Sequence, residues 1–353
     1  MGADDWRVAP VSSPSWDDDG WLDRLEEQLD SQDSPNRPRT KRRPRHDAAV
    51  TGRVIGVDRG RYRIVTESDG LNHVSANRAR ELRRESIVVG DMVDLVGDLS
   101  GDEGTLARIV RIQPRKNVLR RSADDSDHVE RVIVANVDQL LMVVAAADPE
   151  PRPRLIDRYV VAALDAGIDP ILCVTKTDLA PATPLRDYAG GLDIPMLSLR
   201  NDGAPDDFSA LEELLSGKIT VAVGHSGVGK STLVNRLVPE ANRDVGDVNV
   251  VTGRGRHTSS SSSALWLPSG GWIIDTPGVR SFGLGHVSGE AIDRGFPDLA
   301  HLLEQCPRGC QHSADEADCA LAIALESGEI EDRELHRIES LRRLRELSQA
   351  ADR

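Results

Sequence analysis

The chain has 353 residues, with 44 Lys+Arg against 58 Asp+Glu and a net charge of −14. This length allows two or three domains with real hydrophobic cores, and the net acidity argues against indiscriminate binding of nucleic acid. No apolar run is long enough to span a bilayer, and the acidic residues 1–5 are not typical of a signal peptide. Three of the four cysteines are clustered, which does not favour a secreted protein held by disulfides. We therefore expect a cytoplasmic protein with no membrane partner.

The first 46 residues have the composition of a disordered tail. Between Ser34 and His46 there are six basic residues, three prolines and no acidic residue. Such a run cannot pack a core, but it can lie along the phosphates of a nucleic acid. A solvated tail without a partner explains the same composition, so both interpretations stay open.

Short strands separated by turns follow in residues 47–121. We predict strands at 50–57, 61–66, 88–96 and 104–112. The first two flank Asp58-Arg59-Gly60, a hairpin pattern. Several short strands in so few residues favour a small β-barrel of the OB-fold type.

This barrel region is basic within an acidic protein. Residues 53–121 carry 14 basic and 10 acidic side chains. A barrel that exposes its arginines would bind RNA, through the backbone because few aromatic residues are available for stacking, whereas a purely structural barrel is the alternative. The candidate arginines are Arg59, Arg61, Arg63, Arg78, Arg80, Arg83 and Arg84.

From residue 122 the pattern changes to alternating strands and helices. We predict strands at 139–145, 170–178, 194–199 and 218–223, and helices at 155–166, 208–215 and 231–238. The alternation is typical of an α/β domain.

The strand at 170–178 ends in T-K-T-D, which is similar to the guanine-specificity motif N-K-x-D of GTPases. Asp178 can accept hydrogen bonds from N1–H and the 2-amino group of guanine, whereas adenine presents an acceptor at N1. The aliphatic stem of Lys176 can cover the base. Thr175 replaces Asn, and its hydroxyl can make part of the amide's contacts. Ser198 and Leu199 end the next strand, where GTPases close over guanine.

A glycine-rich loop joins the strand at 218–223 to the following helix. It reads G-x-x-x-x-G-K-S, the phosphate-binding P-loop, whose backbone N–H groups can surround phosphate oxygens at the positive end of the helix. Lys230 would reach the β- and γ-phosphates, and the Ser231 hydroxyl would ligate Mg²⁺. The predicted nucleotide-binding residues here are Gly224, His225, Ser226, Gly227, Val228, Gly229, Lys230, Ser231 and Thr232.

Two further segments complete a predicted GTPase site. Thr258, at the end of G-R-G-R-H-T, is the candidate that senses the γ-phosphate and completes Mg²⁺ coordination, although a flexible polar loop has the same composition. Two short strands, at 264–267 and 272–274, lead into D-T-P-G. Asp275 would hold Mg²⁺ through water, and the Gly278 amide would bond the γ-phosphate.

A cluster of cysteines and a histidine follows these motifs. Cys306, Cys310, His312 and Cys319 form C-x3-C-x-H-x6-C, a pattern that favours a Zn²⁺ site; coincidental thiols or a redox pair are the alternatives. Cys173, inside a predicted core strand, is expected to be a small buried hydrophobe.

The last predicted element is a helix with an apolar stripe. The stripe consists of Leu335, Ile338, Leu341 and Leu344, and the basic residues on other faces are Arg337, Arg342, Arg343 and Arg345. We expect this helix to pack on the zinc module and to expose basic residues to RNA.

The guanine motif precedes the P-loop by about fifty residues, the reverse of the order in ordinary GTPases. A circular permutation explains this order, because the sheet stays intact when the old termini are joined and a surface loop is opened. GHSGVGKS, GRHT, DTPG, the upstream OB-like region and the Cys₃His segment together resemble the circularly permuted GTPases of the small ribosomal subunit. The cysteine spacing departs slightly from the one usual in that family.

The resemblance implies three domains after the tail: an OB-fold RNA-binding domain at 47–121, a permuted GTPase domain at 122–288 and a zinc-binding helical domain at 289–353. It implies an enzyme that binds the 30S subunit and its 16S rRNA, assists late maturation and hydrolyses GTP to GDP and phosphate with ribosome-stimulated turnover. The implied cofactors are GTP/GDP, Mg²⁺ and one Zn²⁺ per chain, and we expect a monomer.

Two other classes of function stay open on the sequence. A P-loop ATPase or small-molecule kinase would not need Asp178 and would prefer ATP. An RNA-binding module with a vestigial nucleotide site is the second alternative. The sequence argues against it because the nucleotide-binding set is complete: Lys230, Ser231, Asp275 and Gly278.

Overall fold

We describe the protein from a computed structural model, which describes residues 48–66, 71–82, 85–122, 130–202, 204–239, 262–276, 282, 284–328, 330 and 332–351. Contacts divide the chain into two units, Met1–Arg45 and His46–Arg353. The described residues all belong to the second unit, and the predicted tail with its basic run lies outside them.

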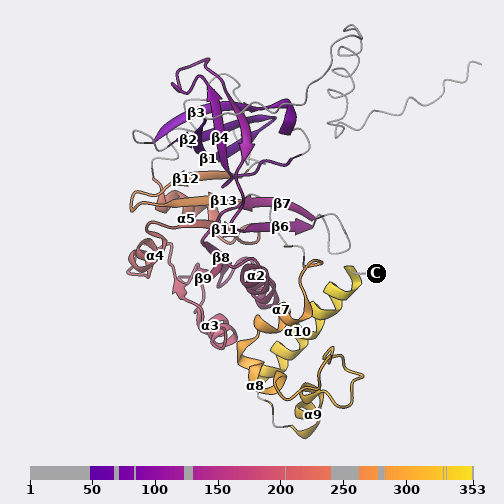
Figure 1. The fold of residues 1–353 in the computed structure, drawn as a ribbon. Helices are drawn as coiled ribbons and strands as arrows, with labels where there is room; N and C mark the ends of the chain where they lie inside the picture. Colours follow the sequence, from indigo (N-terminus) through magenta and orange to yellow (C-terminus); the bar gives the residue numbers. More distant parts are fainter. Residues whose placement is uncertain are drawn as a thin grey trace, which may run out of the picture. The chain divides into compact units, whose positions relative to one another are not determined.

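The first five strands form a closed barrel (Figure 1). They are β1 (Val50–Asp58), β2 (Arg61–Thr66), β3 (Asn72–Arg78), β4 (Met92–Gly97) and β5 (Ala107–Ile112), with a short 3₁₀ helix, η1 (Arg80–Leu82), after β3. Their order is β1-β2-β3-β5-β4, and β4 pairs back with β1. The β3–β5 pair is parallel and the other pairs are antiparallel. This closure confirms the predicted OB-type barrel.

Local backbone conformation explains where the barrel strands begin and end. Arg59 and Gly60 both have positive φ, 44° and 82°, as the two-residue turn of a tight hairpin requires. The strand predicted at 88–96 is shorter in the structure because the chain turns at Gly90, which has φ 94°. A Cβ there would lie 1.9 Å from the Ala135 carbonyl oxygen, so only glycine fits.

A two-stranded ribbon follows the barrel. It consists of β6 (Val118–Ser122) and β7 (Glu130–Ala135), which pair antiparallel. A single bridge from Val89 to Val134 connects the ribbon to the chain just before β4. Neither strand is predicted from the sequence.

The central sheet confirms the permuted arrangement. Its parallel strands, in spatial order, are β10 (Met196–Ser198), β9 (Asp169–Thr175), β8 (Gln139–Ala145), β11 (Ile219–Val223) and β13 (Trp272–Asp275). The antiparallel strand β12 (Ser263–Trp266) follows β13 and pairs with β1 through Gly56 and Ser263. The barrel strands and the central strands therefore belong to one hydrogen-bonded sheet.

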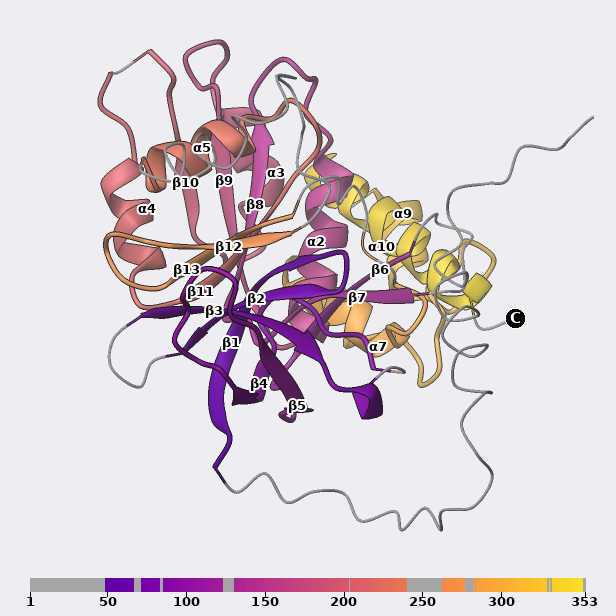
Figure 2. The same ribbon diagram turned by 90° about the horizontal axis from the view of Figure 1, so that it is seen from above.

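Helices cover both faces of this sheet. They are α2 (Pro153–Asp165), α3 (Thr183–Ala189), α4 (Phe208–Leu215) and α5 (Lys230–Leu237). Because side chains alternate along a strand, Met142 of β8 packs in one core with Tyr159 of α2, while Leu141 packs in another with Leu233 of α5. Figure 2 shows α2 on one side of β8 and β9, and α4 and α5 on the other.

Short helices and one long helix form the C-terminal part. They are α7 (Gly289–Arg294), η2 (Pro297–Leu299), α8 (Ala300–Leu303), α9 (Ala320–Ser327) and α10 (Asp332–Ala351). Ile338, Leu341 and Leu344 of α10 are fully buried, as predicted, but Leu335 is 37% exposed. No helix in the described part of the chain is both long and apolar enough to cross a membrane.

The prediction that α10 exposes its arginines was wrong for two of them. Arg337 is completely buried and Arg345 is 8% exposed. Arg337 pairs with Asp157 and Asp298, and Arg345 pairs with Asp293. Carboxylates from other elements therefore turn this face of the helix into a packed, charged interface.

Candidate nucleotide and metal sites

The P-loop lies at the carboxyl edge of the central sheet. It leaves β11, between β8 and β13, and enters α5 at Lys230. Gly227 and Gly229 have φ of 84° and 91°. A Cβ on Gly224 would lie 2.4 Å from the Val143 carbonyl oxygen. These glycines permit a backbone path that residues with side chains could not follow.

Three of the predicted phosphate and metal residues, Lys230, Ser231 and Asp275, lie in or beside this loop. Lys230 Nζ pairs with Asp275 Oδ1 and donates to the Thr276 carbonyl oxygen at 3.2 Å. Ser231 and Thr232 lie on the exposed first turn of α5. The hydroxyl of Ser231 and the carboxylate of Asp275 are oxygen ligands of the kind Mg²⁺ prefers, so these residues fit that ion. Of the other predicted residues, His225 has its Nδ1 3.1 Å from the Ser226 carbonyl oxygen.

Thr258 and Gly278 lie outside the described residues, so their predicted roles are not placed.

Thr175 connects the guanine motif to the P-loop. It ends β9, is 5% exposed, and its hydroxyl donates to the Val228 carbonyl oxygen at 2.5 Å. Lys176 follows with φ 56°, and its ammonium donates to the Asp148 carbonyl oxygen in the loop before α2. The two residues therefore tie the end of β9 to both neighbouring loops of the site.

The predicted base-closing segment lies next to Asp178. Asp178 Oδ1 accepts the Asn201 N–H at 2.9 Å. The Leu199 carbonyl oxygen accepts the Thr177 N–H at 3.1 Å, and the Leu199 N–H binds the Val174 carbonyl oxygen. The structure thus brings Ser198 and Leu199 beside Lys176 and Asp178.

Sequence reasoning missed two carboxylates in this region. Asp207 Oδ2 accepts the Ser198 N–H at 2.7 Å, and Asp206 Oδ2 accepts the Arg200 N–H at 3.1 Å. No motif marks these residues, because they lie in a polar loop in which the sequence does not distinguish them from the exposed Asp202. Only the fold shows that they hold the backbone at Ser198 and Arg200.

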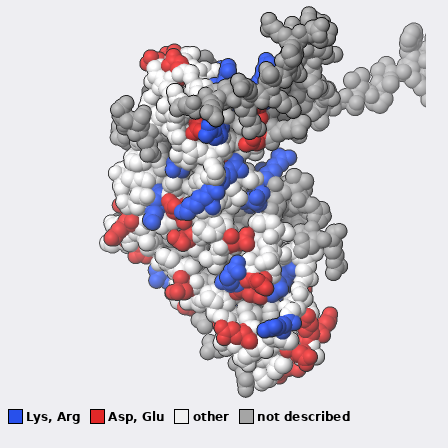
Figure 3. All heavy atoms as spheres, viewed as in Figure 1, with Lys and Arg blue, Asp and Glu red and all other residues white. Residues whose placement is uncertain are grey.

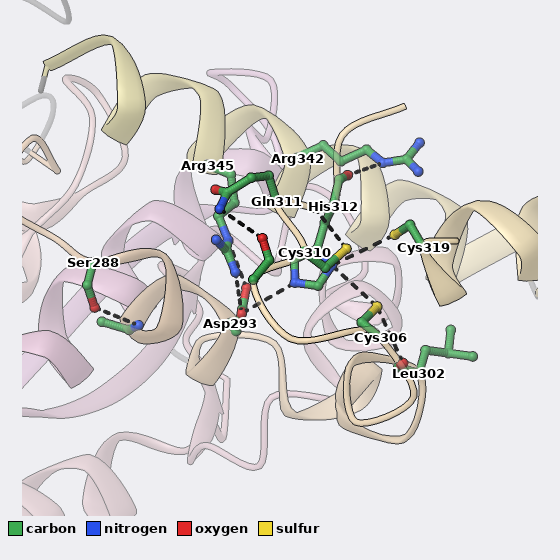
Figure 4. Close-up of polar contacts among 12 residues, drawn as sticks. Ser288, Asp293, Leu302, Cys306, Cys310, Gln311, His312, Cys319, Arg342 and Arg345 are labelled. Atoms are coloured by element: carbon green, nitrogen blue, oxygen red, sulfur yellow. Dashed lines mark hydrogen bonds and ion pairs between the residues drawn. The ribbon is translucent and has the colours of Figure 1, made fainter. Parts of the chain in front are cut away.

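The four predicted zinc ligands form one cluster (Figure 4). Their ligand atoms lie within 4.8 Å of one another. Three sulfur atoms surround His312 Nδ1, at 3.4 Å from Cys306, 3.3 Å from Cys310 and 3.8 Å from Cys319. Three thiols and an imidazole are the donor set of structural Zn²⁺ sites, so these residues fit one zinc ion.

Elements far apart in the sequence support this cluster. His312 Nε2 lies 3.5 Å from Asp293 Oδ2 of α7, and Asp293 pairs with Arg345 of α10. Arg342 of α10 donates to the His312 carbonyl oxygen at 2.8 Å. Burial raises the pKa of the Cys319 thiol, but hydrogen bonding to His312 and backbone amides outweighs it and lowers that pKa to about 7. A carboxylate on the far imidazole nitrogen fixes which nitrogen faces the metal.

Comparison with known proteins gives consistent matches. A model of the RsgA GTPase family matches residues 112–285. A Pseudomonas aeruginosa protein named small ribosomal subunit biogenesis GTPase RsgA is 41% identical over 255 residues, which cover 69% of this chain and 72% of that protein. The Pseudomonas fluorescens protein of the same name is 40% identical over 263 residues, covering 72% and 74%.

Two solved structures share the fold. YjeQ from Thermotoga maritima superposes with a TM-score of 0.63 at 25% identity and covers 85% of this chain and 99% of its own. YloQ, described as a circularly permuted GTPase, superposes with a TM-score of 0.59 at 27% identity, covering 86% and 98%.

Proposed function

The chain belongs to the RsgA GTPase family, and from this premise we propose that it hydrolyses GTP in the late maturation of the 30S ribosomal subunit. One observation carries the proposal most directly. The guanine motif at the end of β9 and the P-loop at the end of β11 open on the same edge of one parallel sheet, although their order in the chain is reversed. Family membership also favours GTP hydrolysis over the ATPase, kinase and vestigial-site alternatives.

In the proposed reaction, water attacks the γ-phosphate of GTP and GDP leaves. Lys230 and the P-loop amides would hold the phosphates, and Ser231 and Thr258 would ligate Mg²⁺, with Asp275 holding it through water. When bound between Ser231 and Thr258, Mg²⁺ would neutralise charge on the β- and γ-phosphates. The Gly278 amide would bond the γ-phosphate and so report whether it is present.

Selection of guanine would fall to the loops around Asp178. Its carboxylate would accept from the base, the stem of Lys176 would cover it, and Ser198 and Leu199 would close the other side. The contact between Thr175 and Val228 supports this assignment, since it fixes the guanine motif relative to the phosphate loop.

One zinc ion per chain would have a structural role. Cys306, Cys310, His312 and Cys319 would bind it, and their contacts with α7 and α10 would connect the ion to the rest of the C-terminal domain. We divide the chain, as a proposal, into a tail (1–46), an RNA-binding barrel (47–121), a GTPase domain (122–288) and a zinc-binding helical domain (289–353).

The proposed partner is the 30S subunit with its 16S rRNA, met by a monomer in the cytoplasm. Exposed arginines of the barrel support an RNA contact: Arg59, Arg61, Arg63, Arg78 and Arg80. On β2, Arg61 and Arg63 alternate with buried Tyr62 and Ile64, as on a strand with one face in solvent. Figure 3 shows the Lys and Arg side chains interspersed with Asp and Glu on the face in view. Such a surface favours a specific site over indiscriminate binding.

The partner is tested by sedimenting the protein with isolated 30S subunits. A non-hydrolysable GTP analogue should retain the protein on the subunits and GDP should release it, since the γ-phosphate is the only difference between the two states. Lys230→Ala, which weakens phosphate binding, should lose this nucleotide dependence. If the protein failed to co-sediment with the subunits in every nucleotide state, the proposed partner would be wrong.

A further inference from the structure

Asp206 forms an unusually complete set of contacts in the loop between β10 and α4. Its side chain is 5% exposed and accepts two hydrogen bonds from Arg236, at 2.7 and 3.0 Å. It also accepts the backbone N–H groups of Arg200 and Phe208, both at 3.1 Å. The hydrogen bonds from Arg236 lower the pKa of the Asp206 carboxyl, so it is ionised at neutral pH. An ionised carboxylate with four donors has a fixed position.

The partner cation belongs to the helix that begins at the P-loop. Arg236 is in the last turn of α5, whose first residue is Lys230. Its guanidinium lies 3.8 Å above the ring of Phe208, the first residue of α4. Because a planar guanidinium is held both by the bidentate pair and by stacking, it has little rotational freedom. The pair therefore connects the phosphate-binding helix to the loop on the guanine side.

This connection reaches Asp178 through two consecutive peptide groups. Asp206 holds the N–H of Arg200, and the next N–H, that of Asn201, donates to Asp178 Oδ1 at 2.9 Å. Rotation of the backbone at Arg200 would direct the Asn201 N–H away from the carboxylate. The hydrogen bond from Asn201 sets the orientation of the Asp178 carboxylate, and Asp206 sets the orientation of that donor.

We propose that Asp206, clamped by Arg236, is a positioning residue that sets the guanine selectivity of the site by orienting Asp178. The inference rests on the proposed guanine site at Asp178 and adds what makes that carboxylate selective. A residue that only stabilised the loop would lower the stability of the protein and leave its discrimination between bases unchanged.

The two roles are separated by comparing GDP with IDP, which lacks only the 2-amino group of the base. The ratio of their Kd values isolates the contact between that amino group and a carboxylate. For the full-length wild-type protein we expect GDP to bind about tenfold or more tightly than IDP, the value of one hydrogen bond to a charged group.

Asp206→Asn should reduce this GDP preference several-fold, because an amide cannot accept the guanidinium bidentately and the loop loses its fixed position. Arg236→Gln removes the clamp from the other side and keeps Asp206. It should have the same effect, and it serves as the test if the first variant folds poorly.

Asp202→Asn is the matched control. Asp202 lies in the same loop, is 40% exposed and binds the side chain of Arg200 instead of its backbone, so the ratio should stay at the wild-type value.

The outcomes distinguish this inference from the function on which it rests. Wild-type protein that binds GDP and IDP equally would contradict the guanine site at Asp178, and the inference would fail with it. A wild-type preference that persists in both Asp206→Asn and Arg236→Gln would leave the guanine site intact and overturn the positioning role alone.

Discussion

Among single residues, Asp178 carries the proposed base selectivity. Its carboxylate can accept hydrogen bonds from N1–H and the 2-amino group of guanine, whereas adenine has no donor at N1. Asp178→Asn should remove most of the preference for GTP over ATP, since each charge-assisted hydrogen bond that is lost costs about 1.5–3 kcal/mol. Competition binding with both nucleotides measures this. If the variant discriminated as strongly as the wild type, the guanine site would have to be elsewhere.

The buried hydroxyl of Thr175 supports the P-loop. Its hydroxyl satisfies the Val228 carbonyl oxygen of the P-loop, and both groups are buried. Thr175→Val keeps the shape of the side chain but leaves that acceptor unsatisfied, at a cost of about 1–3 kcal/mol, so GDP affinity should fall while the GDP:IDP ratio stays constant. Thr175→Ser retains the hydroxyl and should bind GDP almost as well as the wild type. Equal GDP affinities for the Val and Ser variants would show that this hydrogen bond does not support the site.

The sequence predicts residue roles where one short motif contains all the partners. The spacing of T-K-T-D and of the P-loop is enough to predict roles for Lys176, Asp178 and Lys230, and these roles stay predictions. Asp206 was not predictable, because its partner Arg236 is thirty residues later and belongs to another element. Thr175 lies between these cases: the sequence indicated a weaker substitute for Asn, and only the fold shows which carbonyl oxygen its hydroxyl reaches.

At the scale of elements, α10 is joined to α2 by a buried and an exposed ion pair, which allows a matched comparison. Arg337 is fully buried against Asp157 and Asp298. Arg154 and Glu339 are 55% and 49% exposed and pair at 3.1 Å. Arg337→Met leaves two buried carboxylates without their cation and should lower the free energy of unfolding by about 3–5 kcal/mol. Arg154→Met should cost less than about 1 kcal/mol.

Urea-induced unfolding of both variants measures the difference between these two pairs. Similar costs for Arg337→Met and Arg154→Met would contradict a structural role for the buried cation.

The zinc cluster is tested by its metal content. Purified protein should contain about one zinc per chain, and Cys310→Ala should lower both the zinc content and the thermal stability, because metal binding contributes to the folding of such loops. Cys173→Ala is the control, since that thiol is completely buried in the central sheet and should leave zinc content unchanged. Absence of zinc from wild-type protein prepared without chelators would refute the site.

Elements were predicted best where the hydrophobic period is clear. β8 and α4 agree with their predicted bounds, because β8 is a short apolar run and α4 carries its apolar residues at helical spacing. β3 was missed, since Val74 and Ala76 are its only buried residues among polar neighbours. In α10, three of the four apolar residues that the period places on the buried face are buried, but the period cannot show that acidic residues elsewhere in the fold draw Arg337 and Arg345 inward.

At the scale of the whole molecule, the order of motifs along the chain was enough to predict the permutation. A P-loop that follows the guanine motif is compatible with one parallel sheet only if the chain enters that sheet at a different strand, and the strand order β10-β9-β8-β11-β13 agrees. The strand pairing between barrel and sheet was not predictable. It depends on one pairing, Gly56 with Ser263, between segments far apart in the sequence and without a distinctive pattern.

We propose that the chain is a GTPase whose turnover depends on the 30S subunit. In many GTPases a glutamine after the D-x-x-G glycine orients the attacking water, but here that position is Val279, whose side chain can form no hydrogen bond. Binding of GTP should therefore be intact while the attacking water is poorly positioned. A missing group supplied by a partner can raise the rate by about 10³–10⁵.

The most direct measurement is single-turnover GTP hydrolysis at saturating nucleotide, with and without isolated 30S subunits. We predict a slow rate for the protein alone and an increase of several orders of magnitude with the subunits. A fast rate for the isolated protein that the subunits leave unchanged would show that the chain carries its own water-positioning group, and would contradict activation by the ribosome.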